Sequence, residues 1–180
     1  KGSVLNETEI DDDGNMSEKY ERIYDEKGNM TEMRHYFEND LAESTVYFYN
    51  DKDNTEKEIL KYADGSETKT HYTYDSENNL SEKKTTDADG ELENRETFKY
   101  SGKELVEHCR YDGEESLLES TKYIYDTANP EKLKEEINYQ KEHDIELRTV
   151  YLDDETGSVT YNKEGKIHSR QKLTYDERKR

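Results

Sequence analysis

The stretch Tyr72-Thr-Tyr74-Asp75-Ser-Glu-Asn78-Asn79-Leu80 contains the pattern that decides the fold. Two tyrosines at alternate positions are typical of a strand with one half-buried face. The Asp and Asn residues that follow tolerate the positive φ that tight hairpin turns require. The stretch therefore predicts a strand that ends at Tyr74, a turn, and a new strand that opens with the aliphatic Leu80.

The same pattern recurs along the whole chain. The strand-ending tyrosine returns every 24 to 26 residues, as Tyr24, Tyr49, Tyr74, Tyr100, Tyr125, Tyr151 and Tyr175. A second series falls between these residues, as Tyr36, Tyr62, Tyr111, Tyr139 and Tyr161. A third set precedes the first by two positions, as Tyr47, Tyr72, Phe98 and Tyr123. A fixed period of this length indicates tandem structural repeats.

Acidic or glycine-containing turns follow most of these tyrosines, as in Asp25-Glu-Lys-Gly28-Asn29. A turn every 12 to 13 residues leaves about 8 residues for each strand, which is an ordinary strand length. After the first-series turns the next strand opens with an apolar residue, namely Met30, Leu80, Leu105, Leu133 or Val159. We expect this residue to lie opposite the tyrosine that closed the previous strand, because hairpin neighbours form cross-strand pairs.

The segment from Glu131 to Leu147 is ambiguous when it is taken alone. It contains good helix formers, with Leu133 and Ile137 four residues apart, so a helix is one interpretation. The repeat places Tyr139 at a strand end, and this register predicts a hairpin instead.

The composition is unusual for a folded chain. Leu, Ile, Val and Phe account for only 27 of the 180 residues, and the net charge is −19. Such values are typical of disorder, but the aromatic content of 11% and the single proline, Pro130, oppose it. The composition therefore predicts an ordered protein with a thin core, in which each strand contacts only its neighbours.

The segments Tyr24-Asp25-Glu-Lys-Gly28-Asn29-Met30 and Tyr72 to Leu80 resemble the YD repeat of the Rhs family, which runs Tyr-x-Tyr-Asp-x-x-Gly-Asn-Leu. The resemblance covers about residues 16–176 and is strongest in two or three copies. It implies a long antiparallel meander in secreted or surface-attached proteins. In large members of the family this meander forms a hollow shell around a toxin or other cargo.

We therefore predict an all-β fold, an extended antiparallel meander of tandem hairpins of about 25 residues, open and twisted or curved, with little conventional core. Residues 1–180 are expected to form a single repeat domain of about seven repeats, with atypical terminal repeats.

Tyrosines supply the first set of candidate binding residues, because tyrosine offers a flat apolar face and a hydroxyl to a wet interface. The candidates for a sugar- or peptide-binding surface are Tyr47, Tyr72, Tyr74, Tyr123 and Tyr125. The alternative is structural, since tyrosines that pack a one-layer sheet would repeat in the same way. The structural interpretation is the one we favour.

A row of glutamates follows the opening aliphatic residues by two positions, as Glu32, Glu82, Glu107 and Glu135. Alternation predicts that they share a face with the tyrosines, which adds Glu82 and Glu107 to the candidate binding residues. Paired carboxylates can hydrolyse glycosides, but a repeated glutamate is explained more simply as a solvated strand position.

Three acidic turns resemble fragments of calcium loops, and their weak candidate ligands are Asp11, Asp13, Asp87 and Asp89. None contains the full set of alternating oxygens, a glycine and a distant bidentate glutamate. The histidines lack metal-ligand spacing, so we predict no metal and no cofactor.

The acidic charge argues against nucleic acid and anionic membranes as partners, and no transmembrane segment is evident. The single cysteine, Cys109, excludes an internal disulfide.

We expect a non-catalytic, adhesion-like structural and interaction module of a bacterial secreted or cell-surface protein. It would be extracellular after removal of a signal or anchor, with a glycan or protein ligand at the cell surface. One alternative is a carbohydrate-binding or weakly glycoside-hydrolysing accessory domain that uses the Glu and Tyr side chains. Another is a calcium-stabilised spacer. An open meander also has two edge strands, so an edge-strand dimer through the strand near residues 3–10 is considered.

Overall fold

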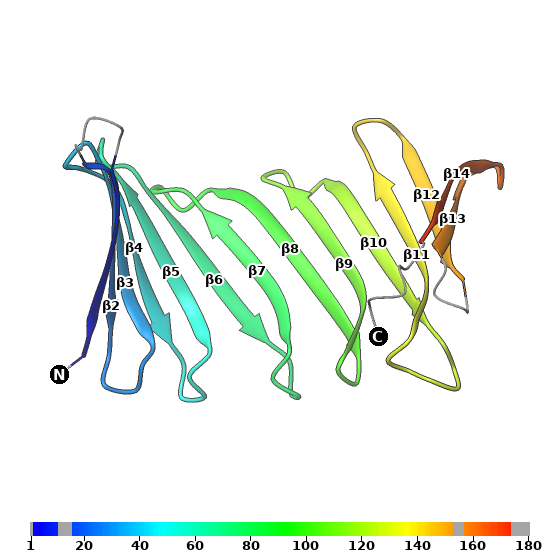
Figure 1. The fold of residues 1–180 in the computed structure, drawn as a ribbon, viewed down its shortest axis with the longest axis horizontal. Coiled ribbons are helices and arrows are strands. Elements are labelled where there is room, and N and C mark those ends of the chain that lie inside the picture. Colours follow the sequence, from blue (N-terminus) through cyan, green and yellow to red (C-terminus); the bar gives the residue numbers. More distant parts are fainter. Residues whose placement is uncertain (1, 11–15, 153–156, 174–180) are drawn as a thin grey trace. The chain divides into compact units, whose positions relative to one another are not determined.

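The computed structural model describes residues 2–10, 16–152 and 157–173, and all regular secondary structure in them is β-strand. Fourteen strands follow one another, in sequence order, in an antiparallel sheet that has β1 and β14 at its two ends (Figure 1). The predicted all-β meander of hairpins is confirmed. The strands are β1 (Val4–Ile10), β2 (Met16–Tyr24), β3 (Met30–Phe37), β4 (Asp40–Tyr49), β5 (Thr55–Tyr62), β6 (Glu67–Tyr74), β7 (Leu80–Thr86), β8 (Leu92–Ser101), β9 (Glu104–Asp112), β10 (Leu117–Tyr125), β11 (Leu133–Gln140), β12 (Ile145–Tyr151), β13 (Gly157–Asn162) and β14 (Ile167–Lys172).

Packing divides the chain into two compact units, which are described separately. Unit 1 comprises residues 1–73 and 83–93, and unit 2 comprises residues 74–82 and 94–180. Unit 1 therefore contains β1 to β5 and nearly all of β6, whereas unit 2 contains most of β8 and all of β9 to β14. That residues 1–180 act as a single domain stays a prediction.

A five-residue turn with an Asp or Asn at its first position connects many of the strands. In the first example, Oδ1 of Asp25 accepts hydrogen bonds from the main-chain N–H groups of Lys27 and Asn29, at 2.8 and 2.9 Å. The fourth residue of the turn, Gly28, has a φ of +94°, which favours glycine. The same double hydrogen bond is made by Asn50, Asp75, Asp87 and Asp112. These Asp and Asn side chains thus stabilise the turns, because they accept hydrogen bonds from main-chain N–H groups that have no partner in a neighbouring strand.

Most of the testable cross-turn pairs form as the sequence predicts. Tyr24 lies opposite Met30, Tyr100 opposite Leu105, and Tyr125 opposite Leu133. The expectation for Val159 is wrong, because Val159 pairs with Val150 and the residue opposite Tyr151 is Ser158. No register shift separates these last two pairs.

A β-bulge recurs near the start of the strands that follow the first-series turns. Between the pairs Tyr24–Met30 and Ile23–Glu32, one strand advances by one residue and the other by two. The extra residue is Thr31, and its counterparts are Glu56, Val106 and Lys134. Because side chains alternate between faces, each bulge moves every later residue of its strand to the face opposite to the one that simple alternation predicts.

A similar bulge near the start of β4 decides the face of Leu41. Simple alternation along the strand would put Leu41 on the same face as Tyr47, but Leu41 pairs with Tyr36 while Glu43 pairs with His35, so Ala42 is the extra residue. Tyr36 and His35 are neighbours on one strand and point to opposite faces. Leu41 therefore lies on the face opposite to Tyr47.

The core is as thin as the composition predicts. Among the described residues Cys109 is the one buried hydrophobic side chain, with 8% of its surface exposed, and the other buried residues are Thr45, Thr70, Thr85 and Ser158. Most strand residues are half-buried. The ambiguous segment forms β11 and β12 of a hairpin, and a helix there is excluded.

Candidate functional site

One face of each unit carries the tyrosines that close the strands, and we call it the tyrosine face. Cross-strand pairs define it, because directly paired residues point to the same side of a sheet. In unit 1 it contains Tyr24, Tyr47 and Tyr49, and in unit 2 it contains Tyr100, Tyr123, Tyr125 and Tyr151. Tyr47, for example, is opposite Glu58, which is opposite the buried Thr70 on the next strand.

The opposite face carries ion pairs such as Lys99–Glu107 and Arg148–Glu135, and we call it the charged face. It contains Glu32 and Arg34 in unit 1, and Glu107, Glu135 and Arg148 in unit 2. The second tyrosine series is mostly on this face, since Tyr36 pairs with Lys19, Tyr111 with Arg95, Tyr139 with Ser120 and Tyr161 with Arg148. Tyr62 is the exception and pairs with Glu43.

Two of the strand-ending tyrosines hydrogen-bond to the main chain of the preceding strand. The Tyr49 hydroxyl donates to the carbonyl oxygen of Met30 at 2.7 Å, and the Tyr125 hydroxyl donates to that of Leu105 at 3.0 Å. In both cases the acceptor belongs to the apolar residue that opens the strand. Burial raises the pKa of both phenols, which keeps them in the donating form.

The five candidate binding tyrosines all lie in strands and are half-buried. Tyr47 and Tyr72 belong to unit 1, whereas Tyr74, Tyr123 and Tyr125 belong to unit 2. Burial is the main cause of the raised pKa of Tyr47, Tyr74, Tyr123 and Tyr125. Much of each ring is thus occupied by packing within the sheet.

The predicted placement of the glutamates on the tyrosine face is wrong. Glu32 pairs with Ile23, Glu107 with Lys99, and Glu135 with Ile124, and each of these partners precedes a strand-ending tyrosine by one residue. The physical reason is the bulge, which inserts one residue between the opening aliphatic residue and the glutamate. The glutamates therefore lie on the charged face.

Each of these glutamates has a cationic partner. The Arg34 guanidinium donates to Glu32 at 2.7 Å, Arg95 to Glu82 at 3.2 Å, and Arg148 to Glu135 through two bonds of 2.7 Å. Lys99 pairs with Glu107. The hydrogen bonds from Arg148 hold the pKa of Glu135 below its ordinary value. A general acid would need the opposite shift.

The calcium candidates divide into two groups. Asp11 and Asp13 lie outside the described residues. Oδ1 of Asp87 accepts the main-chain N–H groups of Asp89 and Glu91, at 3.0 and 2.9 Å, so it has the same role in its turn as Asp25. Across the described ranges, no group of three His, Cys, Asp or Glu side chains is arranged to hold a metal ion.

Two stacked histidines on the tyrosine face were not predicted from the sequence. His35 lies parallel to Tyr20 at 4.5 Å between ring centroids, and His108 lies parallel to Phe98 at 4.6 Å. Each has a carboxylate beside it, Glu18 at 3.5 Å from His35 and Glu96 at 2.8 Å from His108. The pairs Tyr20–His35 and Phe98–His108 are cross-strand neighbours, so only the register could have shown them.

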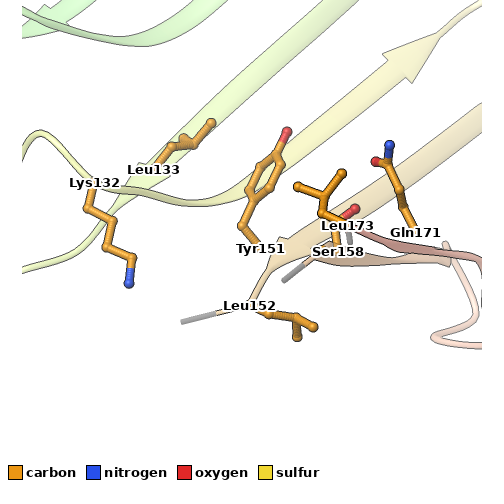
Figure 2. Close-up of a pocket in the computed structure, with 8 residues that line it drawn as sticks. Lys132, Leu133, Tyr151, Leu152, Ser158, Gln171 and Leu173 are labelled. Carbon is orange, nitrogen blue, oxygen red and sulfur yellow. The ribbon is translucent and has the colours of Figure 1, made fainter. Parts of the chain in front are cut away.

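A pocket of about 480 Å³ in unit 2 is a further feature that sequence analysis missed. Its apolar lining is Leu133, Tyr151, Leu152 and Leu173, and Figure 2 shows Ser158 and Gln171 beside them. The Tyr151 hydroxyl donates to the Glu136 carboxylate at 2.9 Å, instead of donating to a main-chain carbonyl as Tyr49 and Tyr125 do. The last hairpin beside it is short in the structure, with strands of six residues each.

In the described part of the chain, no helix has the length and apolarity that crossing a membrane would require.

No protein-family model matches the chain. No curated protein matches it either. Similar solved structures include a chain of the Photorhabdus luminescens Tc holotoxin pore, at 12% identity and a TM-score of 0.41, which covers 93% of this chain and 12% of that one. They also include a porin-like protein from Bacteroides uniformis, at 13% identity and a TM-score of 0.43, which covers 83% of this chain and 60% of that one.

This chain thus spans less than two thirds of either matched protein. The registers, bulges and turns of the chain itself are what identify it as an array of β-hairpin repeats.

Proposed function

We propose that this chain is a non-catalytic β-repeat module of a secreted or cell-surface protein, and that it acts as a structural and interaction domain. The observation that supports this proposal is the repeated use of equivalent residues for equivalent structural tasks. Tyr49 and Tyr125 both donate to the carbonyl of a strand-opening residue, turn aspartates accept main-chain N–H groups, and strand glutamates pair with cations. An array of repeats folds when equivalent residues make the same contacts in successive hairpins.

The glutamates are poorly placed for glycoside hydrolysis. Glu82 is on β7 and Glu107 is on β9, so that β8 separates them. Two strand spacings amount to about 10 Å, whereas the two carboxylates of a glycosidase are held about 5–9 Å apart. Both carboxylates are also engaged by cations, Arg95 and Lys99.

Carbohydrate binding is the second candidate function, and the stacked aromatic residues of the tyrosine face favour it. Tyr20 with His35, and Phe98 with His108, present pairs of parallel rings beside carboxylates. Aromatic faces next to hydrogen-bonding groups suit the amphipathic surface of a sugar ring.

A glycan array combined with a panel of chromogenic glycosides tests these proposals together. For a structural and interaction module we expect no turnover of any glycoside. Binding to a glycan that is lost in Phe98→Ser and kept in the charged-face control Tyr161→Ser would establish the carbohydrate-binding function. Turnover that is abolished by Glu82→Gln or Glu107→Gln would overturn the non-catalytic proposal.

Calcium-stabilised spacing is tested separately by thermal melting with calcium and with a chelator. We expect equal melting temperatures, because Oδ1 of Asp87 already accepts two main-chain N–H groups. A melting temperature that rises with calcium and falls with chelator would favour the spacer.

A further inference from the structure

A second cavity of unit 2 lies where β9 and β11 end and β10 begins. It has a volume of about 440 Å³, within the range of about 300–1,000 Å³ that is usual for small-molecule sites. Its lining is almost entirely polar and consists of Arg110, Leu118, Glu119, Gln140, Glu142 and His143. A cavity lined by hydrogen-bonding side chains suits a ligand that is rich in hydroxyl groups.

Strand register places three of the lining residues in one row on the tyrosine face, and we call this row the polar line. Arg110 pairs with Glu119, and Glu119 pairs with Gln140, on three neighbouring strands that are about 4.8 Å apart. The Arg110 guanidinium donates to the Glu119 carboxylate at 2.7 Å, and both side chains remain partly in water. The polar line thus presents a charged donor, a charged acceptor and an amide that both donates and accepts.

The turn after β11 supplies two further polar side chains. The main-chain N–H of Lys141 donates to the carbonyl oxygen of Leu118 at 2.8 Å, which holds the turn against the start of β10. Glu142 and His143 follow directly and line the cavity. Within the described residues these two side chains have no hydrogen-bond partner, so their polar atoms are available to a ligand.

The stacked pair Phe98–His108 adjoins the polar line on the same face. Along their strands, Phe98 and His108 are each two residues away from the cross-strand pair Glu96–Arg110, so the flat rings are one step from the guanidinium. Nε2 of His108 is 2.8 Å from the Glu96 carboxylate, which fixes the ring beside these charges. An apolar stack next to planar hydrogen-bonding groups matches a sugar ring, which has an apolar C–H side and a rim of hydroxyls.

The equivalent stack in unit 1, formed by Tyr20 and His35, has different surroundings. The next cross-strand pair on its face joins Glu18 to Phe37, so an apolar ring occupies the position that Arg110 has in unit 2. The two stacks therefore differ in the hydrogen-bonding groups beside them, and the unit 1 stack is an internal control for the unit 2 stack.

The charges around the cavity disfavour an acidic sugar. Three carboxylates, those of Glu96, Glu119 and Glu142, lie in or beside it, and the Arg110 guanidinium is already bonded to one of them. An anionic ligand would meet more negative than positive charge, in a chain whose net charge is −19. A neutral sugar avoids this repulsion and uses the same donors and acceptors.

We propose that the tyrosine face of unit 2 binds a neutral sugar of a glycan at this cavity. The apolar side of the sugar lies against the Phe98–His108 stack, and its hydroxyls bond to Arg110, Glu119 and Gln140. The inference rests on carbohydrate binding, the second candidate function, and adds to it the place of the site and the class of sugar.

Titration calorimetry with defined oligosaccharides tests the class of sugar. Neutral probes are cello-, malto- and N-acetylchito-oligosaccharides, the acidic probe is oligogalacturonate, and the cationic probe is a chitosan oligomer. We expect at least one neutral probe to bind and the acidic probe not to bind. Binding confined to the acidic or the cationic probe would overturn the inference and leave carbohydrate binding itself intact. Silence across all probes would contradict both.

Two matched pairs of variants test the place of the site. Gln140→Ala should weaken binding of the neutral probe by about fivefold or more, because it removes an amide from the polar line. Gln171→Ala, on the same face in β14, should leave the affinity unchanged. Phe98→Leu keeps an apolar side chain but removes the flat ring, and it should weaken binding by about tenfold. Tyr20→Leu makes the corresponding change in unit 1 and should not alter the affinity.

The Gln140→Ala variant keeps the test decisive if a substitution at Phe98 unfolds the sheet. Gln140 is exposed, and its side chain has no partner within the described residues, so its removal leaves the fold intact. An unchanged affinity in Gln140→Ala would overturn the inference. Binding that is lost in Tyr20→Leu and kept in Phe98→Leu would place the sugar in unit 1, which also overturns the inference but supports carbohydrate binding.

Discussion

The two faces of the sheet are built from the same strands but differ in their characteristic interactions, although ion pairs such as Arg22–Glu7 occur on the tyrosine face too. On the tyrosine face, phenol hydroxyls reach main-chain carbonyls, and buried threonine hydroxyls meet, as Thr70 and Thr85 do at 3.1 Å. On the charged face, Lys and Arg side chains pair with carboxylates such as Glu82 and Glu135. Most of these groups keep part of their surface in water.

The difference matters because the two kinds of interaction have different strengths. A half-buried aromatic ring with a satisfied hydroxyl removes a large apolar area from water. A solvated ion pair contributes roughly 0–1 kcal/mol. We therefore expect the stability of the sheet to depend mainly on the tyrosine face, and the following predictions test that asymmetry.

Removing a strand-ending tyrosine should give the largest effect. Tyr125→Ala is expected to cost about 2–3 kcal/mol, because it removes a half-buried ring and its hydrogen bond. Tyr125→Phe keeps the ring and should cost about 1 kcal/mol, the contribution of the bond to the Leu105 carbonyl. Chemical denaturation of both variants separates packing from hydrogen bonding. A Phe variant as unstable as the Ala variant would contradict this division.

Substitutions at the fourth residue of the turns should have opposite signs at two sites. Gly28 has a φ of +94°, so Gly28→Ala is expected to cost about 1 kcal/mol. Glu115 adopts a φ of +59° in the same position of its turn, and Glu115→Gly should stabilise the protein by up to about 1 kcal/mol. Thermal melting is the measurement, and a stabilised Gly28→Ala would count against the shared turn geometry.

A small effect is expected from breaking an ion pair on the charged face. A double-mutant cycle with Glu135→Gln and Arg148→Gln should give a coupling of less than about 1 kcal/mol, because the Arg148 side chain is 49% exposed. The coupling should shrink further in high salt. A coupling larger than the cost of Tyr125→Ala would reverse the order of the two faces.

The smallest effect concerns acid stability at one turn. The Lys134 ammonium and the main-chain N–H groups of Ala128 and Asn129 lower the pKa of Asp126 to about 2. Because the folded-state pKa is below the ordinary value of about 3.9, its stabilising effect is present above about pH 4 and is lost as the pH falls toward 2. Asp126→Asn should flatten the stability curve in that window. Urea midpoints between pH 2 and 5 provide the test.

Much of the fold could be predicted from local pattern alone. The tyrosine period located the strand ends, and Asp, Asn and Gly located the turns, because both signals depend on residues close together in sequence. The assignment of 131–147 to a hairpin came from the period, against local helix propensity, and β11 with β12 confirms it.

The candidate site was predicted less well. The tyrosine positions are in strands as expected, but Glu82 and Glu107 lie on the charged face. The stacked pairs Tyr20–His35 and Phe98–His108 depend on which residues lie opposite each other, and a bulge of one residue changes that. The alternation of residues along one strand does not show where a bulge places two residues of that strand opposite a single residue of the neighbouring strand.

The sequence by itself determined the repeat, the strand ends, the turn chemistry and the thinness of the core, because each of these follows from residue type and spacing along the chain. Only the tertiary structure decided which face each side chain occupies, which charges meet, and where the pocket at the end of β14 opens. These features depend on register, and register is set by hydrogen bonds between strands whose bulges shift the pairing by one residue. The tyrosines that indicated the fold are also mostly half-buried parts of the sheet that they identify.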